Sequence, residues 1–487
     1  MPAAPVSPFV SCLAALVGLV LAACTVGPDY EPPQLGSQVV PEGYGSADPA
    51  YVPGATDLTE WWQVFGDAQL TSLIARAVAG NKDLAIAVAR VGEAKARLGY
   101  AKAGRYPNIG VGGSVGLGND RYTGFETRTT SSIGAEVSWE LDLFGRVARQ
   151  IEASAAEFQA TAEDQRDVRV ALLAEVARAY LGVRALQSQL GIAESNIDSQ
   201  REILGLTESR QRSGLSSELD AARARSVLAA SEAQVPPLRI NLAREINTLG
   251  VLLGQNPQAL HDELAAPRPI PVPPTQVAVG VPADLLRQRP DIRAAERRLA
   301  AQTARVGVAT ADLYPTFGIN GQLGLAAPAG GDLFDAGNRS LALGPSMRWT
   351  LFDGGRTRSA IAVEDARVQQ SLLLYEQAVL GALEEVETSM TTFTEQRVRV
   401  EALERAAAAS VEALRLSTIL YRGGLIDYEN VLDVQRSVFT QQNEVASARG
   451  QAAAALVFLY RALGGGWDPA LADAAAEDAT GSVGAPR

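Results

Sequence analysis

Two very long segments without proline constrain the fold of this chain more than any other feature. One runs from Arg146 to Gly214 and the other from Arg356 to Gly423. In the first, apolar residues recur at gaps of three and four, which is the spacing of one face of an α-helix. At a rise of 1.5 Å per residue, such a helix is on the order of 100 Å long, several times the thickness of a bilayer. The sequence therefore predicts two long amphipathic helices.

The two long segments belong to an internal repeat. Three pairs of matching motifs lie 208 to 210 positions apart, namely Tyr106-Pro107 with Tyr314-Pro315, Trp139-Glu140-Leu141 with Trp349-Thr350-Leu351, and Gly214-Leu215 with Gly424-Leu425. Self-similarity at a fixed offset indicates duplication of a whole structural unit. We predict a first repeat over 67–255 and a second over 283–466. The linker between them, 256–282, carries seven prolines, which exclude a continuous helix and favour an extended connection.

Shorter helices are expected around each long one. Return helices are predicted from Ser217 to Gly254 and from Asp427 to Leu463, and further helices from Asp67 to Gly104 and from Ala283 to Asp312. The segment 24–66 is rich in proline, glycine and tyrosine and should form an extended arm. The Ala/Gly/Asp-rich segment 467–487 should be a disordered tail.

Four segments of about ten residues alternate between apolar and polar side chains, a period of two that predicts β-strands. They lie at about 108–118, 131–143, 316–326 and 341–352, two in each repeat. Ten residues is the length that a tilted strand needs to cross a membrane. A soluble sandwich, in which one face of the same strands packs on a core, is the alternative.

Four strands are too few to close a membrane barrel, whose smallest examples need about eight. Open sheet edges are excluded in lipid because their backbone groups would stay unpaired. Other copies of the chain must therefore complete the barrel, with 8 strands from two copies or 12 from three. The long helices would stand in water and bury their apolar stripes against one another. A coiled-coil rod or tether without a duct is the alternative for the helices.

The N-terminus predicts a cleaved signal peptide over 1–23. An apolar run from Phe9 to Ala23 is too short to span a bilayer, although Met1 to Pro8 contain no Lys or Arg. Leu21-Ala22-Ala23-Cys24 resembles the lipobox of bacterial lipoproteins. The resemblance implies that Cys24 becomes the N-terminus of the mature chain and carries diacylglycerol and a fatty acyl group such as palmitate. The alternative is an unmodified thiol in an ordinary secreted protein.

Composition argues against nucleic-acid binding and against most catalytic sites. The net charge of -12 repels phosphate backbones. With one histidine, His261 in the linker, and no second cysteine in the mature chain, His-dependent triads and His-rich metal sites lack their parts. We therefore expect no enzyme, no metal and no cofactor beyond the lipid. A carboxylate-based hydrolase stays open, and its candidates would be Glu136, Glu140 and Asp142.

Together these features resemble one family, the TolC-like outer membrane factors, and in particular their lipoprotein branch, which serves resistance-nodulation-division pumps. The resemblance covers nearly the whole mature chain. It rests on Cys24-Thr25-Val26-Gly27-Pro28-Asp29-Tyr30, Trp61-Trp62-Gln63-Val64-Phe65 with Asp67 and Leu70, Asn81 with Asp83-Leu84, Trp139-Glu140-Leu141-Asp142-Leu143-Phe144-Gly145-Arg146, and Tyr421-Arg422-Gly423-Gly424. It implies a mixed α and β membrane protein, a homotrimer in which a twelve-stranded transmembrane β-barrel continues into a long α-helical barrel.

The resemblance also implies the function and the partners. The chain would be the outer-membrane exit channel of a tripartite efflux pump, closed at its periplasmic tip until a periplasmic adaptor and an inner-membrane pump dock. Drugs or other small molecules would be exported, so the protein would contribute to multidrug resistance. A channel for metal efflux or type I protein secretion is the second hypothesis, and a structural periplasmic tether is the third.

Two turns at the ends of the long helices are the predicted docking sites for the adaptor. Glycine supplies the left-handed conformation that ends a helix, so these turns reverse the chain. Simple helix capping explains the same residues and can hold alongside docking. The residues are Arg212, Gly214 and Leu215 in the first turn and Arg422, Gly424 and Leu425 in the second.

The predicted gate lies beside the second turn. Glu429, Asp433 and Arg436 follow one another at spacings of four and three, so they share a helix face. The resemblance implies that Asp433 faces the lumen at the constriction, while Arg436 and Tyr421 make the bonds that hold it shut. Glu429 departs from the family, where an apolar residue is common. An exposed Asp–Arg pair within one helix, contributing a few tenths of a kcal/mol, is the alternative.

Overall fold

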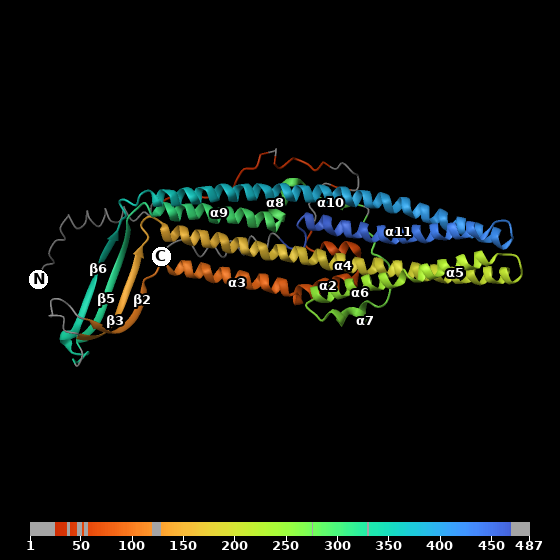
Figure 1. The fold of residues 1–487 in the computed structure, drawn as a ribbon. Helices are drawn as coiled ribbons and strands as arrows, with labels where there is room; N and C mark the ends of the chain where they lie inside the picture. The colour runs from red at the N-terminus through yellow and green to blue at the C-terminus, as the bar shows by residue number, and fades with distance from the viewer. Residues whose placement is uncertain are drawn as a thin grey trace. The chain divides into compact units, whose positions relative to one another are not determined.

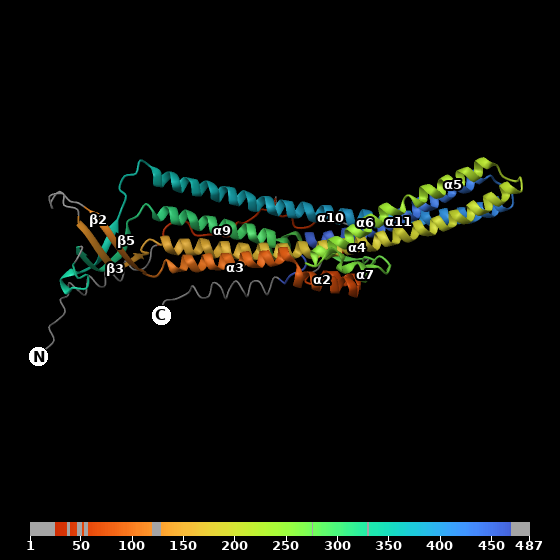
Figure 2. The ribbon, with the colours of Figure 1, turned by 60° about the horizontal axis from the view of Figure 1, so that its bottom comes forward.

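The computed structural model describes residues 25–36, 39–45, 51–52, 57–118, 128–274, 276–328 and 331–468. It divides into two compact units. The first comprises Met1–Gln34, Arg90–Ala162 and Ala294–Tyr375, and the second Leu35–Ala89, Glu163–Arg293 and Glu376–Arg487. Among the described residues, no helix is both long and apolar enough to cross a membrane. Figures 1 and 2 show the elements in two orientations.

The internal repeat is confirmed by helices of matching length. The helices α3 (Lys82–Ala103) and α9 (Pro290–Ala311) have 22 residues each and begin 208 positions apart. The long helices α4 (Arg146–Arg212) and α10 (Arg356–Arg422) have 67 residues each and begin 210 positions apart. The change in offset from 208 to 210 falls between these helix pairs, where each repeat carries its strands.

One antiparallel sheet in the first unit contains all four predicted strands, in the order β2-β3-β5-β6 (Figure 1). The strands are β2 (Asn108–Gly118), β3 (Arg128–Leu141), β5 (Thr316–Pro328) and β6 (Arg339–Arg348). Two of the strands, β3 and β6, begin and end earlier than the sequence predicted. A second, parallel pair joins β1 (Tyr51–Val52) to β4 (Val277–Ala278) in the second unit.

The first return helix is broken, contrary to the prediction of one helix from Ser217 to Gly254. The structure has α5 (Glu218–Glu232) and α6 (Val235–Leu252). Pro236 and Pro237 lack the backbone N–H that a helix interior needs, so the chain begins a new helix where the missing donors cost nothing. The second return helix, α11 (Tyr428–Ala462), has no proline and is continuous.

The helices that precede the strands are also divided. Asn81 separates α2 (Ala68–Gly80) from α3, and its Oδ1 accepts a hydrogen bond of 2.8 Å from the Leu84 amide. In the second repeat α8 (Leu285–Gln288) ends at Arg289, which is extended, as expected for a residue before proline. The sequence predicted one helix in each place because a single Asn or Pro interrupts the apolar pattern only briefly.

The linker and the arm contain short helical turns that were not expected. The linker begins with η3 (Pro257–Leu260) and α7 (His261–Leu264) and ends at η4 (Pro282–Asp284), and the arm contains η1 (Trp61–Phe65). A further 3-10 turn, η5 (Ala336–Asn338), lies between β5 and β6. Trp467 is buried, and its indole donates to the Gln288 carbonyl at 3.0 Å, so it does not belong to a disordered tail. The rest of the predicted tail, 469–487, lies outside the described residues.

Candidate functional site

The strand register gives the sheet one apolar and one polar face. Ile109 lies across from Val137, Trp139 from Ile319, and Leu323 from Leu341, so the apolar side chains of all four strands share a face. Side chains on this face are largely exposed in the single chain, among them Ile109, Val111, Val115, Leu117, Leu323, Leu341, Leu343 and Met347. This sheet therefore does not bury its apolar face against the chain's own core, as a soluble sandwich would.

The polar face carries hydroxyl, amide and charged groups together with many glycines. Glu136 lies across from Gln322, and Ser138 lies across from Asn320. The polar-face glycines of the inner strands are crowded by backbone: a Cβ on Gly134 would lie 3.0 Å from the Leu323 carbonyl oxygen, and one on Gly318 would lie 3.0 Å from that of Trp139. Neighbouring backbones thus approach closely on the polar side.

Both edges of this sheet are unpaired in the single chain. The strand β2 has β3 as its only neighbour and β6 has β5, within the residues that the structure describes. Each edge presents backbone N–H and C=O groups along its length, which is a template for pairing with another strand.

Two of the three carboxylates that a hydrolase would use, Glu140 and Asp142, have structural partners. Glu140 accepts hydrogen bonds from Arg146, from Nε at 2.9 Å and also from Nη2. Asp142 caps α4, accepting from the amides of Val147 at 2.9 Å and Ala148 at 2.7 Å. Arg146 and the amides of the first helical turn thus occupy oxygens of two candidates, whereas Glu136 forms no ion pair or hydrogen bond within the described residues.

Both long helices end in the same hydrogen-bonded turn. Gly214 has φ 69° and donates to the Gln211 carbonyl, while Leu215 donates to that of Arg210. Gly424 has φ 72° and donates to the Tyr421 carbonyl, while Leu425 donates to that of Leu420. This is the Schellman arrangement, in which glycine takes the left-handed position that a side chain would strain. Capping is therefore part of the role of both turns.

The leucines of both turns point into solvent. Leu215 is 68% exposed and Leu425 is 74% exposed. Arg212 and Arg422 are also exposed, and Arg422 forms an ion pair with Glu202 at 3.0 Å. The turns thus present an apolar and a basic side chain side by side.

Tyr421 is the centre of a small core between the two helical hairpins. It packs with Tyr428, whose ring centroid lies 6.0 Å away, and with Val431 and Leu432 of α11. The Arg210 guanidinium lies 4.9 Å from the Tyr421 ring centroid and donates to its backbone carbonyl at 3.2 Å. Arg210 therefore ties α4 to α10, a role that nothing in the sequence pattern indicated.

The other predicted gate residues lie on the surface of the chain. Glu429 forms an ion pair of 3.5 Å with Arg223 of α5. Asp433 and Arg436 are exposed, and within the described residues neither side chain forms an ion pair or hydrogen bond. The two are not paired with each other, so the alternative of a simple intrahelical pair is absent from the single chain.

In the first unit, the segment that follows Cys24 is bound by Arg149 and packs against Gly307, and we call these two residues the socket. Arg149, whose side chain is 4% exposed, donates to the carbonyls of Val26 at 3.2 Å and Gly27 at 3.3 Å and to Asp29 at 2.6 Å. Gly27 has φ 90°, and a Cβ on it would lie 2.4 Å from the Gly307 Cα. Cys24 itself lies outside the described residues. Nothing in the sequence pattern pointed to Arg149.

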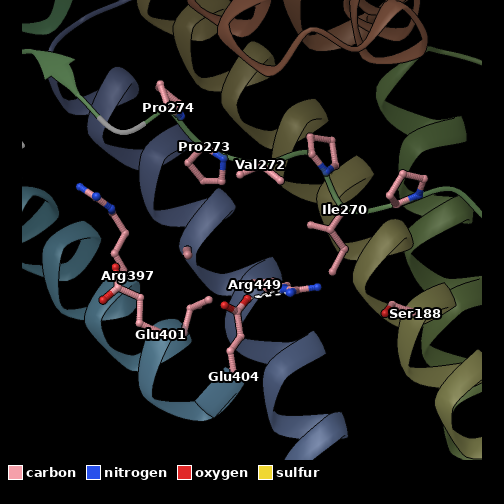
Figure 3. Close-up of a pocket in the computed structure, with 13 residues that line it drawn as sticks. Ser188, Ile270, Val272, Pro273, Pro274, Arg397, Glu401, Glu404 and Arg449 are labelled. Atoms are coloured by element: carbon pink, nitrogen blue, oxygen red, sulfur yellow. Dashed lines mark hydrogen bonds and ion pairs between the residues drawn. The ribbon is translucent and has the colours of Figure 1, made fainter. Parts of the chain in front are cut away.

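A pocket of about 620 Å³ lies in the second unit beneath the proline-rich linker. Figure 3 shows Pro273, Val272 and Ile270 above it, with Glu401 and Glu404 of α10 below. Glu404 forms an ion pair of 2.6 Å with Arg449 of α11. The pocket has an apolar wall and a charged wall, and it contains none of the predicted site residues.

The sequence pattern of the outer membrane efflux protein family matches residues 73–255 and 281–465, which cover both repeats. The chain belongs to this family. Membership assigns the protein to the outer membrane and to efflux, as the sequence analysis predicted, and the relatives are channels rather than enzymes. The four strands, the long helices and the two repeats agree with the predicted fold class.

Individual relatives cover nearly the whole chain. Outer membrane protein OprJ of Pseudomonas aeruginosa is 31% identical over 93% of this chain and 95% of its own. Cation efflux system protein CusC of Escherichia coli is 30% identical over 93% of this chain and 97% of its own. Among solved structures, the outer-membrane channel OprN is similar with a TM-score of 0.83 and 36% identity, covering 91% of this chain and 100% of that one.

Proposed function

We propose that three copies of this chain form the exit duct of a tripartite efflux pump, with a periplasmic adaptor and an inner-membrane pump as partners. The observation that carries the proposal is the four-stranded sheet, which has an exposed apolar face and two unpaired edges. A sheet of this kind is stable in a membrane only when its edges are paired and its apolar face meets lipid.

Pairing of β6 in one copy with β2 in the next satisfies both edges. Neighbouring strands alternate in direction across the sheet, so β2 and β6 run antiparallel and can continue the same ladder. Three copies then supply twelve strands, with apolar side chains toward lipid and polar ones toward an aqueous passage. A periplasmic tether would have no need for such a sheet.

The proposed cargo is drugs or other small molecules. The specificity would lie largely in the inner-membrane pump, because the polar face of the sheet presents mainly small, uncharged groups. Export of metal cations is the second candidate, and the likeness to CusC, a cation efflux system protein, favours it.

The proposed gate is formed by Asp433 and Arg436, with Tyr421 and Glu429 beside them. Threefold symmetry would repeat the two exposed, unpaired charges as rings, so that Arg436 of one copy offsets the repulsion among Asp433 carboxylates. Tyr421 and Glu429 would act differently, because both have partners in their own chain, Arg210 and Arg223.

The exposed turns suit docking of the adaptor, and the socket suits a lipid anchor. Adaptor helices would contact Leu215 and Leu425 and the neighbouring Arg212 and Arg422. Gly214 and Gly424 would set the shape of the turns.

The segment that follows Cys24 is held beside the sheet. Val26 donates to the Phe144 carbonyl at 3.2 Å, just after β3. A lipid on Cys24, two residues earlier, would then enter the membrane that the strands cross.

Reconstitution into planar lipid bilayers tests the duct. The wild-type protein should migrate as a trimer in detergent and produce discrete conductance steps. A monomer that leaves the bilayer resistance unchanged would contradict the proposal and favour a tether.

The replacement Cys24→Ser tests the lipid anchor. It should abolish incorporation of labelled fatty acid, and labelling that persists would show that the anchor lies elsewhere.

A further inference from the structure

Three charged residues on the polar face of the sheet, Glu136, Glu140 and Arg348, lie toward the end that leads into the long helices. In register, Arg348 lies across from Thr316, Glu140 from Gly318, and Glu136 from Gln322. Residues that lie across from one another on neighbouring strands form a row, and these rows are near the end of β3. The strand β3 ends five residues before α4 begins. The next three rows carry mainly small uncharged residues, among them Gly112, Gly134, Gly324, Ser340, Ser114, Ser132, Ala326, Gly116 and Thr130, and the last paired row places Gly118 across from Arg128.

Only part of this charge is neutralised within the chain. Glu140 is paired with Arg146 through two hydrogen bonds. Within the described residues, the side chains of Glu136 and Arg348 form no ion pair or hydrogen bond, and that of Arg348 is exposed. Among the side chains that the structure describes, the polar face thus presents one free carboxylate and one free guanidinium, three rows apart.

Arg348 lies in a polar recess. It lines a space of about 320 Å³ together with Thr316, Asn320, Ser346 and Glu140, and the Glu140 carboxylate is already paired with Arg146. Asn320 donates to the Ser346 hydroxyl at 2.9 Å, which keeps both groups at the surface of the recess. A guanidinium beside hydroxyl and amide donors suits an anionic group such as a carboxylate or phosphate.

We propose that Glu136 and Arg348 set the ion selectivity of the passage at the helix end of the sheet. Arg348 favours anionic solutes and Glu136 favours cationic ones. The inference rests on the proposed function, in which the polar face is the aqueous wall. In a trimer the three guanidinium groups would form one ring and the three carboxylates a second ring three rows away. Each ring would act on the solutes that pass it, so removing one ring should shift the selectivity toward the ions that the other ring favours.

Accessibility of a reporter cysteine tests this without depending on the state of the helix tips. The replacement Ser346→Cys places a thiol two residues from Arg348 on the same face of β6. Membrane-embedded trimers are treated from outside, at low ionic strength, with an anionic and a cationic methanethiosulfonate reagent. The natural cysteines are Cys12 and Cys24, and the parent protein gives their background rate.

Adding Arg348→Ser to this reporter should lower the ratio of anionic to cationic reaction rates by about two- to fourfold. Arg339→Ser is the matched control, because Arg339 lies across from Leu325 and so belongs to the opposite face of β6. The control should leave the ratio unchanged. With an Ala342→Cys reporter, in the row of Glu136, Glu136→Ser should shift the ratio in the opposite direction.

The two possible failures are distinguishable. A ratio that stays constant in the Arg348→Ser and Glu136→Ser proteins overturns the selectivity inference while the duct stands. A Ser346→Cys thiol that reacts with neither reagent, in a trimer where a Leu343→Cys thiol on the apolar face reacts with both, overturns the proposed function itself. Arg348→Gln, which retains a polar side chain, replaces the serine variant if the latter does not form trimers.

Discussion

The indole nitrogen of Trp139 donates a hydrogen bond to the backbone carbonyl of Arg105 at 3.0 Å. In the second repeat Trp349 donates to the carbonyl of Leu313 at 3.1 Å. Trp139 lies near the end of β3 and Trp349 directly follows β6, and each bond reaches the residue before the Tyr-Pro pair of the same repeat. The duplicated Trp motif therefore has the same structural role in both halves, which is to tie the strand pair to the helix that precedes it.

Loss of either indole donor should weaken the sheet only modestly. Trp139→Phe and Trp349→Phe keep an aromatic ring but leave the carbonyl without this donor, at a cost of about 1 kcal/mol. We expect each replacement to lower the thermal unfolding midpoint measured by circular dichroism in detergent, and the double variant to show both losses added. A single variant that abolishes trimers would mean that the ring has a larger role than this bond.

Removal of Arg149 should release the segment after Cys24. Arg149→Met leaves two backbone carbonyls and Asp29 without their buried donor, and we expect a loss of about 2 kcal/mol. Limited proteolysis should then cut within 25–36 faster than in the wild type. The matched control is Asp29→Asn, which removes only an exposed partner and should cost less than about 1 kcal/mol. Equal proteolysis of both variants would contradict the socket.

High pH should weaken the core around Tyr421. Burial, followed by the nearby Tyr421, raises the pKa of Tyr428 to about 12. Above the unfolded value of about 10, the unfolded chain loses this proton while the folded chain keeps it, so stability falls between pH 10 and 12, by about 2 kcal/mol for this group. Tyr428→Phe lacks the titration, and its stability should decline less than that of the wild type in that window. Parallel declines would show that Tyr428 does not contribute.

Neutralising the proposed gate should raise single-channel conductance. Asp433→Ala removes a ring of carboxylates, and the double replacement with Arg436→Ala removes their cross-copy partners as well. Planar bilayers give the readout. Asp427→Ala, an exposed carboxylate that begins the same helix, is the control and should conduct as the wild type does. Unchanged conductance in both gate variants would reject the assignment to the constriction.

The sequence predicted those parts of the fold that periodic patterns dictate. Alternation along the strands placed Ile109 and Val137 on one face, and the register confirms it, because a one-residue slip would have put apolar groups among polar ones. The breaks at Asn81 and Pro236 were missed. A single capping residue or a pair of prolines leaves the helical spacing of the surrounding apolar residues almost unchanged. Only the backbone hydrogen bonds therefore reveal where one helix ends and the next begins.

The candidate site was less predictable because it depends on contacts between distant segments. Arg149 and Arg210 look like ordinary helix-surface arginines in sequence, and their partners lie more than 100 positions away. The roles of Asp433 and Arg436 remain predictions, since their partners would belong to other copies of the chain.

Equal length of the two 67-residue helices restricts how such a chain can change during evolution. Deleting one turn from α4 alone would displace its Schellman turn by about 5 Å relative to that of α10 and separate Arg210 from Tyr421. Gains or losses of whole turns should therefore be inherited as matched events in both halves of the gene.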